Sequence, residues 1–275
     1  MGLGENRIKS KINDKPSAVT GPVSYSSYLK VPELLLLQHP LSEPVAHDEL
    51  LFIIVHQTYE LWFKQVIYEM EALVGNLLED NLTKSFRLLG RIDEIFQVLI
   101  QQICVLETMT PVEFNRFRSH LNPASGFQSF QFRELEVLSG ADPTQYKALM
   151  ELNPEWKTKL SSRMRNLSLR GAFIQLLAKR DIMPSRDPSE LPKAILEVYL
   201  NEKHQDLYAL CEHLIQYDEQ FGLWRFRHVQ MVERMIGMKK GTGGSLGVRY
   251  LQDTLKMRFF PELWEARTEM SPGSY

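Results

Sequence analysis

Cysteine is scarce in this chain: Cys104 and Cys211 are the only two, and neither belongs to a CxxC or CxxCH motif. A disulfide framework, a zinc site built on cysteine and a covalently attached c-type haem are therefore not expected. Long apolar runs are also missing, because the longest, LLFIIV at 50–55, is far shorter than the roughly 18 residues that span a bilayer. The formal net charge of −2 gives no general attraction to nucleic acids or membranes.

The N-terminal stretch 1–22 contains lysines but no apolar run behind them, so we expect no secretory signal. Asn6 stands where myristoylation would require serine or threonine. Charged residues make up 24% and hydrophobic residues 44% of the chain, a balance typical of a globular protein. These features predict a soluble, cytoplasmic protein that has neither nucleic acid nor a membrane as a partner.

Helix-start signals recur along the chain. TPVE at 110–113 is a capping box with proline at the first helical position, where its missing N–H does no harm. Related signals are DPTQ (142–145), DPSE (187–190), NPE (153–155) and SGFQ (125–128). No alternating run flanked by Asn-Gly or Asp-Gly indicates a β-hairpin. The pattern predicts an all-α protein.

The periodicity predicts where the helices lie. We expect helices at about 28–38, 45–80, 82–108, 111–120 and 126–139, short helices within 142–200, and helices at about 203–238 and 246–257, followed by the FFPELWEAR tail. No internal repeat or linker divides the chain. We therefore expect a flexible arm (1–24), one large helical bundle domain (25–267) and a C-terminal tail (268–275).

No two of the seven histidines lie three or four residues apart, so no helix presents a local zinc-binding pair such as HExxH. Two histidines nevertheless fall on apolar helical stripes. The stripes are Trp224, His228, Met231, Met235 and Phe52, His56, Tyr59, Phe63. Each pattern by itself is typical of a packed core histidine bonded to a carbonyl. Two such histidines on separate helices are also compatible with a flat macrocycle held between the helices.

Three arginines, Arg225, Arg227 and Arg234, lie near His228. They could neutralise the carboxylates of such a macrocycle. Stripes rich in methionine and aromatic residues are also ordinary core, so the local pattern leaves both interpretations open.

Arg118 follows Phe114 and Phe117 and precedes a tight Pro-Ala-Ser-Gly loop. An arginine among aromatic side chains can bind a planar carboxylate through two parallel hydrogen bonds. An internal salt bridge with one of the many glutamates is an equally reasonable interpretation.

The glycine-rich stretch KGTGGS, 240–245, lacks the GxxxxGK[ST] order of a phosphate-binding loop. It could form a flap whose backbone N–H groups and Thr242 hydroxyl meet a small polar ligand. Gly241 could equally be the C-cap of the preceding helix. The two interpretations are compatible with each other.

Taken together, several segments resemble the tryptophan 2,3-dioxygenase family. They are YSSYL (25–29), HDELLFIIVHQTYELWFK (47–64), LETMTPVEFNRFRSHLNPASGFQSFQFRELE (106–136), FGLWRFRHVQMVERMIGMKKGTGGSLGVRYL (221–251) and RFFPELWEAR (258–267). The resemblance implies an all-helical protein with haem b in its core. It further implies insertion of both atoms of O2 across the indole C2–C3 bond of L-tryptophan, giving N-formylkynurenine.

The resemblance also implies roles for single residues. His228 matches the axial ligand of the haem iron, and His56 matches the distal histidine near the indole N–H, a positioning group more than an obligatory base. Phe52 matches a wall of the indole pocket. Arg118 matches the group that binds the substrate carboxylate, and Thr242 the flap hydroxyl.

Further matches concern the rim of the site and the assembly. Phe114 stands where some members carry a tyrosine, which leaves the carboxylate to Arg118, and Ser125 lies beside the haem. Tyr25 and Tyr28 match an N-terminal segment that reaches into a neighbouring subunit's site, which implies an intertwined homotetramer.

Residues 141–215 match the family pattern less clearly, and we expect this divergence to affect the surface or the assembly. Some relatives use the scaffold for mono- or dioxygenation of substituted tryptophans, which is the alternative function; the intact GTGGS sequence favours L-tryptophan.

Overall fold

The computed structural model describes residues 22–146, 150–151, 154–183, 185, 187–239 and 247–270. The described residues form helices and no strand, so the predicted all-α class is confirmed. The chain divides into two compact units, Met1–His39 and Pro40–Tyr275. The limits expected for the arm, the bundle domain and the tail stay predictions.

The described part of the first unit contains two short helices, α2 (Tyr25–Leu29) and α3 (Val31–Leu34), where one helix was expected. Ser24 caps α2, because its hydroxyl accepts a hydrogen bond from the backbone N–H of Ser27. Lys30 separates the two helices in a left-handed backbone conformation (φ +56°) that ends α2.

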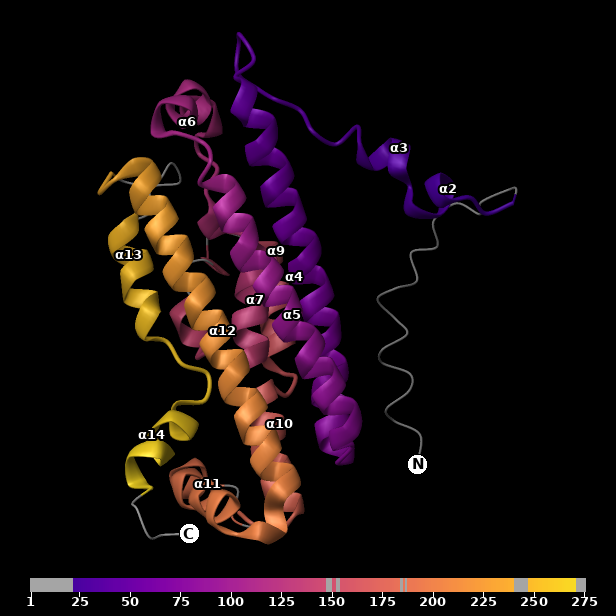
Figure 1. The fold of residues 1–275 in the computed structure, drawn as a ribbon, viewed down its shortest axis with the longest axis vertical. Helices are drawn as coiled ribbons and strands as arrows, with labels where there is room; N and C mark the ends of the chain where they lie inside the picture. Colours follow the sequence, from indigo (N-terminus) through magenta and orange to yellow (C-terminus); the bar gives the residue numbers. More distant parts are fainter. Residues whose placement is uncertain are drawn as a thin grey trace. The chain divides into compact units, whose positions relative to one another are not determined.

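Three long helices, as expected, form the frame of the second unit: α4 (His47–Glu79), α5 (Leu82–Leu106) and α12 (Gln205–Ile236). The middle one, α5, packs against both α4 and α12, and the three run side by side (Figure 1). A tight connection at Asp80 (φ +66°) ends α4, and the Asn81 side chain caps α5 by accepting from the Lys84 N–H.

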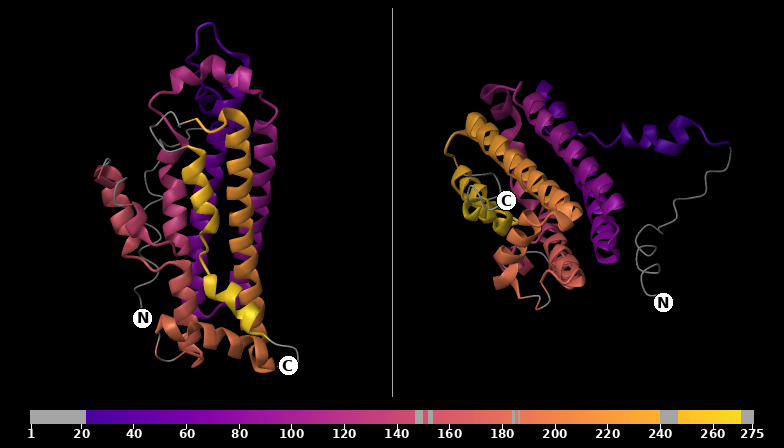
Figure 2. Two further views of the ribbon diagram at one scale, coloured as in Figure 1. Left: turned by 90° about the vertical axis from the view of Figure 1, so that its left-hand side faces the viewer. Right: turned by 60° about the horizontal axis from the view of Figure 1, so that its bottom comes forward.

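A second layer covers α4. It consists of α7 (Phe130–Ser139) and α10 (Leu169–Lys179), which pack on α4, and α9 (Pro154–Met164), which packs on α7 (Figures 1 and 2). Buried Arg163 of α9 fastens this layer, because its guanidinium pairs with Glu71 of α4 and Glu134 of α7.

Shorter helices cover the two ends of the bundle (Figure 2). At one end lie α6 (Pro111–Phe117) and the 3-10 helix Arg118–Leu121. At the other end α11 (Leu191–Leu200) packs against α14 (Pro261–Glu269). Between the two ends, α13 (Val248–Asp253) lies beside α12 (Figure 1). The FFPELWEAR stretch was expected at the end of the bundle domain without a helix of its own, but from Pro261 onward it forms α14, which packs against α11.

Buried Asp218 of α12 holds this C-terminal segment. Its carboxylate accepts hydrogen bonds from the backbone N–H groups of Phe259 (3.0 Å) and Phe260 (3.4 Å) and from Nε1 of Trp264 (2.9 Å). The aromatic pair and the helix after it are thereby fixed to the middle of α12.

The remaining described helices are single 3-10 turns. They span Gly126–Gln128, Pro143–Tyr146, Pro188–Glu190, Glu202–His204 and Thr254–Lys256. The long α12 ends at Ile236, two residues earlier than expected, because Gly237 takes a positive φ of 58° that favours glycine.

Within the described residues, no single helix has the length and apolar composition needed to cross a membrane. One sharply bent pair, Leu82–Leu106 followed by Pro111–Leu121 at 89°, would qualify by length and composition alone.

Candidate active site

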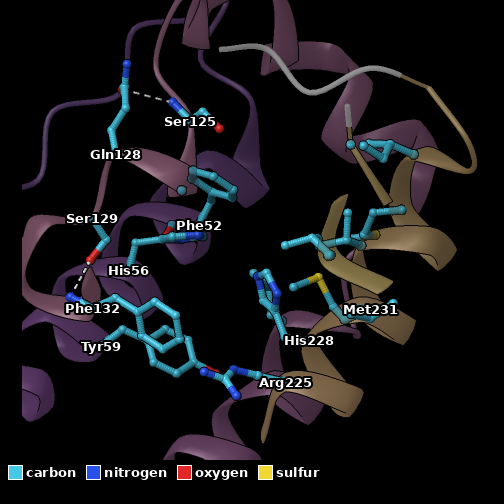
Figure 3. Close-up of a pocket in the computed structure, with 18 of the residues that line it drawn as sticks. Phe52, His56, Tyr59, Ser125, Gln128, Ser129, Phe132, Arg225, His228 and Met231 are labelled. Carbon is cyan, nitrogen blue, oxygen red and sulfur yellow. Dashed lines mark hydrogen bonds between the residues drawn. The ribbon is translucent and has the colours of Figure 1, made fainter. Parts of the chain in front are cut away.

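A cavity of about 530 Å³ opens between α4 and α12. The 3-10 helix after α6, the loop before α7, α7 itself and α13 complete its walls. Its volume lies within the range typical of small-molecule and cofactor sites. Figure 3 shows His228 and Met231 of α12 facing Phe52 and His56 of α4 across it.

The wall from α4 is the stripe predicted from the sequence: Phe52, His56, Tyr59 and Phe63 all line the cavity. The Nδ1 atom of His56 lies 2.7 Å from the backbone oxygen of Phe52. Because a carbonyl oxygen can only accept, Nδ1 carries the proton and Nε2 keeps a lone pair. The Phe52 ring packs on this imidazole with centroids 4.0 Å apart.

Burial lowers the pKa of His56 below its ordinary value, although the bond to the Phe52 carbonyl and the charge of Glu60 act in the opposite direction. His56 is therefore neutral at pH 7 and can accept a hydrogen bond through Nε2.

The wall from α12 is the second predicted stripe: Trp224, His228, Met231 and Met235 all line the cavity. The ring of His228 stacks on that of Trp224, with centroids 5.1 Å apart and an interplanar angle of 10°. Burial lowers the pKa of His228 to about 4, and the charges of His56 and Arg133 add to this effect. A neutral imidazole inside an apolar cavity is the form that ligates a metal ion.

Three further residues predicted from the sequence line the same cavity: Phe114, Arg118 and Ser125. Phe114 belongs to an aromatic group with Phe52 (centroids 5.8 Å apart) and Phe117 (5.3 Å). Arg118 begins the 3-10 helix at this end of the bundle and is half-buried. The guanidinium of Arg118 therefore lines the same cavity as a wall of aromatic side chains.

A buried charged cluster lies at one end of the cavity, where Arg225, Tyr59 and Phe132 gather in Figure 3. Glu136 of α7 pairs with Arg133 (2.7 Å) and with Arg225 of α12 (2.9 Å), and it accepts a hydrogen bond from the Tyr146 hydroxyl (2.8 Å). The three charged groups sum to one positive charge. All three line the cavity, so an anionic group bound there would be stabilised.

The arginines expected near a macrocycle are placed differently from one another. Arg225 lines the cavity, whereas Arg227 pairs with Glu107 (3.0 Å) and Arg234 is exposed, and neither of these lines it. One arginine of the three therefore lines the cavity, and its role toward a macrocycle stays a prediction. Arg133, which was not predicted from the sequence, also lines the cavity.

Three further residues were predicted for the site: Thr242, Tyr25 and Tyr28. Thr242 falls outside the described residues, as does Gly241. Tyr25 and Tyr28 lie on α2 of the first unit, with side chains 80% and 74% exposed. Their roles stay predictions.

A sequence model of a known family, described as tryptophan 2,3-dioxygenase, matches residues 11–169 and 190–270 of this chain. The matched residues include both stripes and every described residue that was predicted to line the site. The chain belongs to the tryptophan 2,3-dioxygenase family.

Curated relatives agree with this family assignment. A tryptophan 2,3-dioxygenase from Nocardioides sp. is 46% identical over 253 residues, which cover 90% of this chain and 95% of the relative. The enzyme of that name from Myxococcus xanthus is 41% identical over 276 residues, 94% of each chain. One from Xanthomonas oryzae pv. oryzae is 39% identical over 267 residues, 92% of this chain and 90% of the relative.

The divergence expected over 141–215 is narrower than predicted. The family model matches 141–169 and 190–215, so the unmatched part is 170–189. Of these residues, 170–179 form all of α10 except its first residue, and 188–189 begin the 3-10 helix that precedes α11.

Some of the residues around the cavity were not predicted from the sequence. Glu60 was visible in principle, because it follows His56 by four residues and so lies on the same face of α4. Arg133 and Glu136 form an i,i+3 pair that is more often a surface ion pair. Nothing local in the sequence indicated that Arg225, a distant residue, would share the same carboxylate.

Proposed function

We propose that this member of the family is a haem-dependent dioxygenase that inserts both atoms of O2 across the indole C2–C3 bond of L-tryptophan, giving N-formylkynurenine. Family membership supports the reaction. The observation that supports the site is the cavity itself, which gathers Phe52, His56, Arg118 and His228 from separate segments.

The residues around the cavity fit haem b. His228 would ligate the iron, because its imidazole is neutral and lies in an apolar wall with Met231 and Met235. Arg133 and Arg225, which share Glu136, leave a net positive charge that the carboxylates of haem would neutralise. When bound, ferrous haem supplies the binding and activation of O2, and the protein supplies orientation and exclusion of water.

The other residues suit the recognition of an amino acid with an indole ring. Arg118 can donate two parallel hydrogen bonds to the carboxylate. Phe52 and Phe114 form an apolar wall for the ring. The Nε2 lone pair of His56 can accept the indole N–H, which fixes the orientation of the ring without requiring His56 to remove the proton.

Three features of the family extend the proposal beyond the described cavity. Thr242 would add a hydroxyl at the polar end of the substrate, and Ser125 would lie beside the haem. Tyr25 and Tyr28 would reach the site of a neighbouring subunit in a homotetramer. A cytoplasmic location also belongs to the proposal.

The test is a single-turnover reaction. Haem-loaded, ferrous protein is mixed with L-tryptophan under anaerobic conditions, exposed to ¹⁸O₂, and the product mass is measured. A gain of two labelled oxygen atoms supports the proposal, and a gain of one indicates monooxygenation. If L-tryptophan is unchanged while a substituted tryptophan gains oxygen, the alternative substrate is correct.

A further inference from the structure

Glu60 lies one helical turn after His56 on α4, and both residues line the cavity. The loop that leads into α7 binds the carboxylate of Glu60. The Ser129 hydroxyl donates to one carboxylate oxygen (2.6 Å), and Nε2 of Gln131 donates to the other (2.8 Å). The same Gln131 nitrogen also contacts the backbone oxygen of Glu60 (2.9 Å).

These bonds join α4 to a loop that is itself well connected. Within residues 125–131, the Gln128 N–H donates to the Ser125 oxygen (2.9 Å), and the Ser129 N–H to the Gly126 oxygen (3.1 Å). The Gln128 side chain closes the turn by accepting from the Ser125 N–H (3.2 Å), as Figure 3 shows. Hydrogen bonds therefore connect this loop internally and connect it to Glu60 of α4.

The loop also continues directly into the cavity wall. Ser129 caps α7 by accepting from the Phe132 N–H (3.3 Å), and Phe132 packs on Trp224 with centroids 4.9 Å apart. A displacement of Ser129 would therefore change both the position of Ser125 and the start of α7 beside the stack of Trp224 and His228.

We propose that Glu60 is a positioning residue, which fastens residues 125–131 to the helix that carries Phe52 and His56 and thereby sets the spacing between these two walls of the cavity. The carboxylate acts through its two hydrogen bonds to Ser129 and Gln131. It does not need to touch the substrate.

The charge of Glu60 gives this residue a second, separable effect. It favours the protonated form of His56 and so opposes the effect of burial on the pKa of that imidazole. The other titratable or charged groups that line the cavity are Tyr59, Arg118, Arg133, Glu136, Arg225, His228 and Tyr250. Of the two carboxylates that line the cavity, Glu60 lies on the helix of His56 and Glu136 on α7, so removal of the Glu60 charge should shift the pKa of His56 still lower.

Three variants separate the hydrogen bonds from the charge. In Glu60→Gln the amide oxygen still accepts from Ser129, but the charge and the acceptor for Gln131 are lost. Glu60→Ala removes both bonds. The exchange Glu60→Gln with Gln131→Glu restores the side-chain bond in the reverse direction and moves the charge off α4, but it removes the donor to the backbone oxygen at position 60.

The first measurement is hydrogen–deuterium exchange of the haem-loaded full chain, read on peptides that cover residues 125–133. We expect exchange in Glu60→Ala to be about tenfold faster than in the wild type, the loss corresponding to roughly one charge-assisted hydrogen bond. Glu60→Gln should be intermediate, and the exchanged pair should return close to the wild type. Glu69→Gln is the matched control, because Glu69 lies on α4 and binds Gln65 and Arg91 instead.

The second measurement is the pH profile of kcat/KM for L-tryptophan, which rests on the proposed function. Its acid limb should move to lower pH in both Glu60→Gln and the exchanged pair, because the charge of Glu60 no longer favours protonated His56. If Glu60 acted only through its hydrogen bonds, the exchanged pair would show the acid limb of the wild type. Unchanged exchange of 125–133 in Glu60→Ala and Glu60→Gln would overturn the positioning role, even if the chain has no activity on tryptophan.

If Glu60→Ala does not fold, hydrogen–deuterium exchange of Glu60→Gln and the exchanged pair still tests the positioning role. Faster exchange that the exchanged pair does not reverse would show that the two bonds are not the cause, and would also overturn the proposal.

Discussion

Asp218 and Arg225 lie seven residues apart on α12, both buried, yet their surroundings differ. The Asp218 carboxylate receives three N–H groups from residues 259–264 of its own chain. Arg225 shares Glu136 with Arg133, and this cluster retains a net positive charge beside the cavity.

The difference separates a structural group from a binding group. Where the fold supplies complementary hydrogen bonds, as at Asp218, the group stabilises the fold. Where a buried cluster carries excess charge next to a cavity, a ligand of opposite charge is expected to complete it. The two halves of α12 should therefore respond to mutation in different ways.

The largest effect is expected on the cavity side, at His228. His228→Ala removes the proposed iron ligand and should abolish stable haem binding, measured as loss of the Soret band after reconstitution. The circular dichroism spectrum should stay helical, because the side chain faces a cavity. His204→Ala, at the start of the same helix, is the control and should keep its haem. Normal haem content in His228→Ala would show that His228 does not hold the haem.

Arg118→Ala should raise the KM for L-tryptophan, because the loss of a bidentate, charge-assisted contact costs about 2 to 5 kcal/mol of binding. Haem content should not change. Arg116→Ala is the matched control, since Arg116 is exposed and pairs with Glu113. An equal KM in Arg118→Ala and the wild type would remove Arg118 from the substrate site.

Asp218 is the structural group of the two, and Asp218→Ala should lower the free energy of unfolding by about 2 to 4 kcal/mol, because it leaves buried N–H groups without an acceptor. Urea denaturation measures this loss. Asp218→Asn keeps one acceptor oxygen and should lose less. If Asp218→Ala instead removed haem without affecting stability, the distinction between the two halves of α12 would be wrong.

A pH-dependent effect is expected at Asp93 of α5, which is 2% exposed and whose carboxylate has no hydrogen-bond partner within the described residues. Burial raises its pKa to about 7, and the charge of Glu94 adds to this. The unfolded value is near 3.8, so the stability linked to Asp93 is complete below about pH 4 and is lost as the pH rises through 7.

This loss amounts to at most roughly 4 kcal/mol, reached above pH 7. Asp93→Asn cannot ionise, so its stability relative to the wild type should increase between pH 4 and pH 8, as measured by urea denaturation at each pH. Exposed Asp253→Asn is the control and should show no such trend. A pH-independent difference for Asp93→Asn would mean that the carboxyl ionises normally.

The long helices of the bundle were predictable because their patterns are local. The apolar periodicity of α4, α5 and α12 repeats over many turns, and their bounds were predicted to within a few residues. The short elements were harder. The break at Lys30 depends on a left-handed residue that is not glycine, and the helix α14 depends on Asp218, which lies more than forty residues away.

For the site, the two histidine stripes could be read from spacing, and the roles of Arg118 and Ser125 came from resemblance. The charged cluster could not be predicted, because Arg133, Glu136 and Arg225 meet only after α7 and α12 pack together. The contact of Glu60 with Ser129 and Gln131 joins residues about seventy positions apart, so it too is a product of the fold.

The bond between His56 Nδ1 and the Phe52 oxygen has a consequence for ligand selectivity. Because the imidazole presents a lone pair to the cavity, it attracts a heteroaromatic ring that carries N–H and repels one whose heteroatom is oxygen or sulfur. The benzofuran and benzothiophene counterparts of tryptophan, although nearly equal in shape, should therefore be held more weakly, by about 1 to 3 kcal/mol.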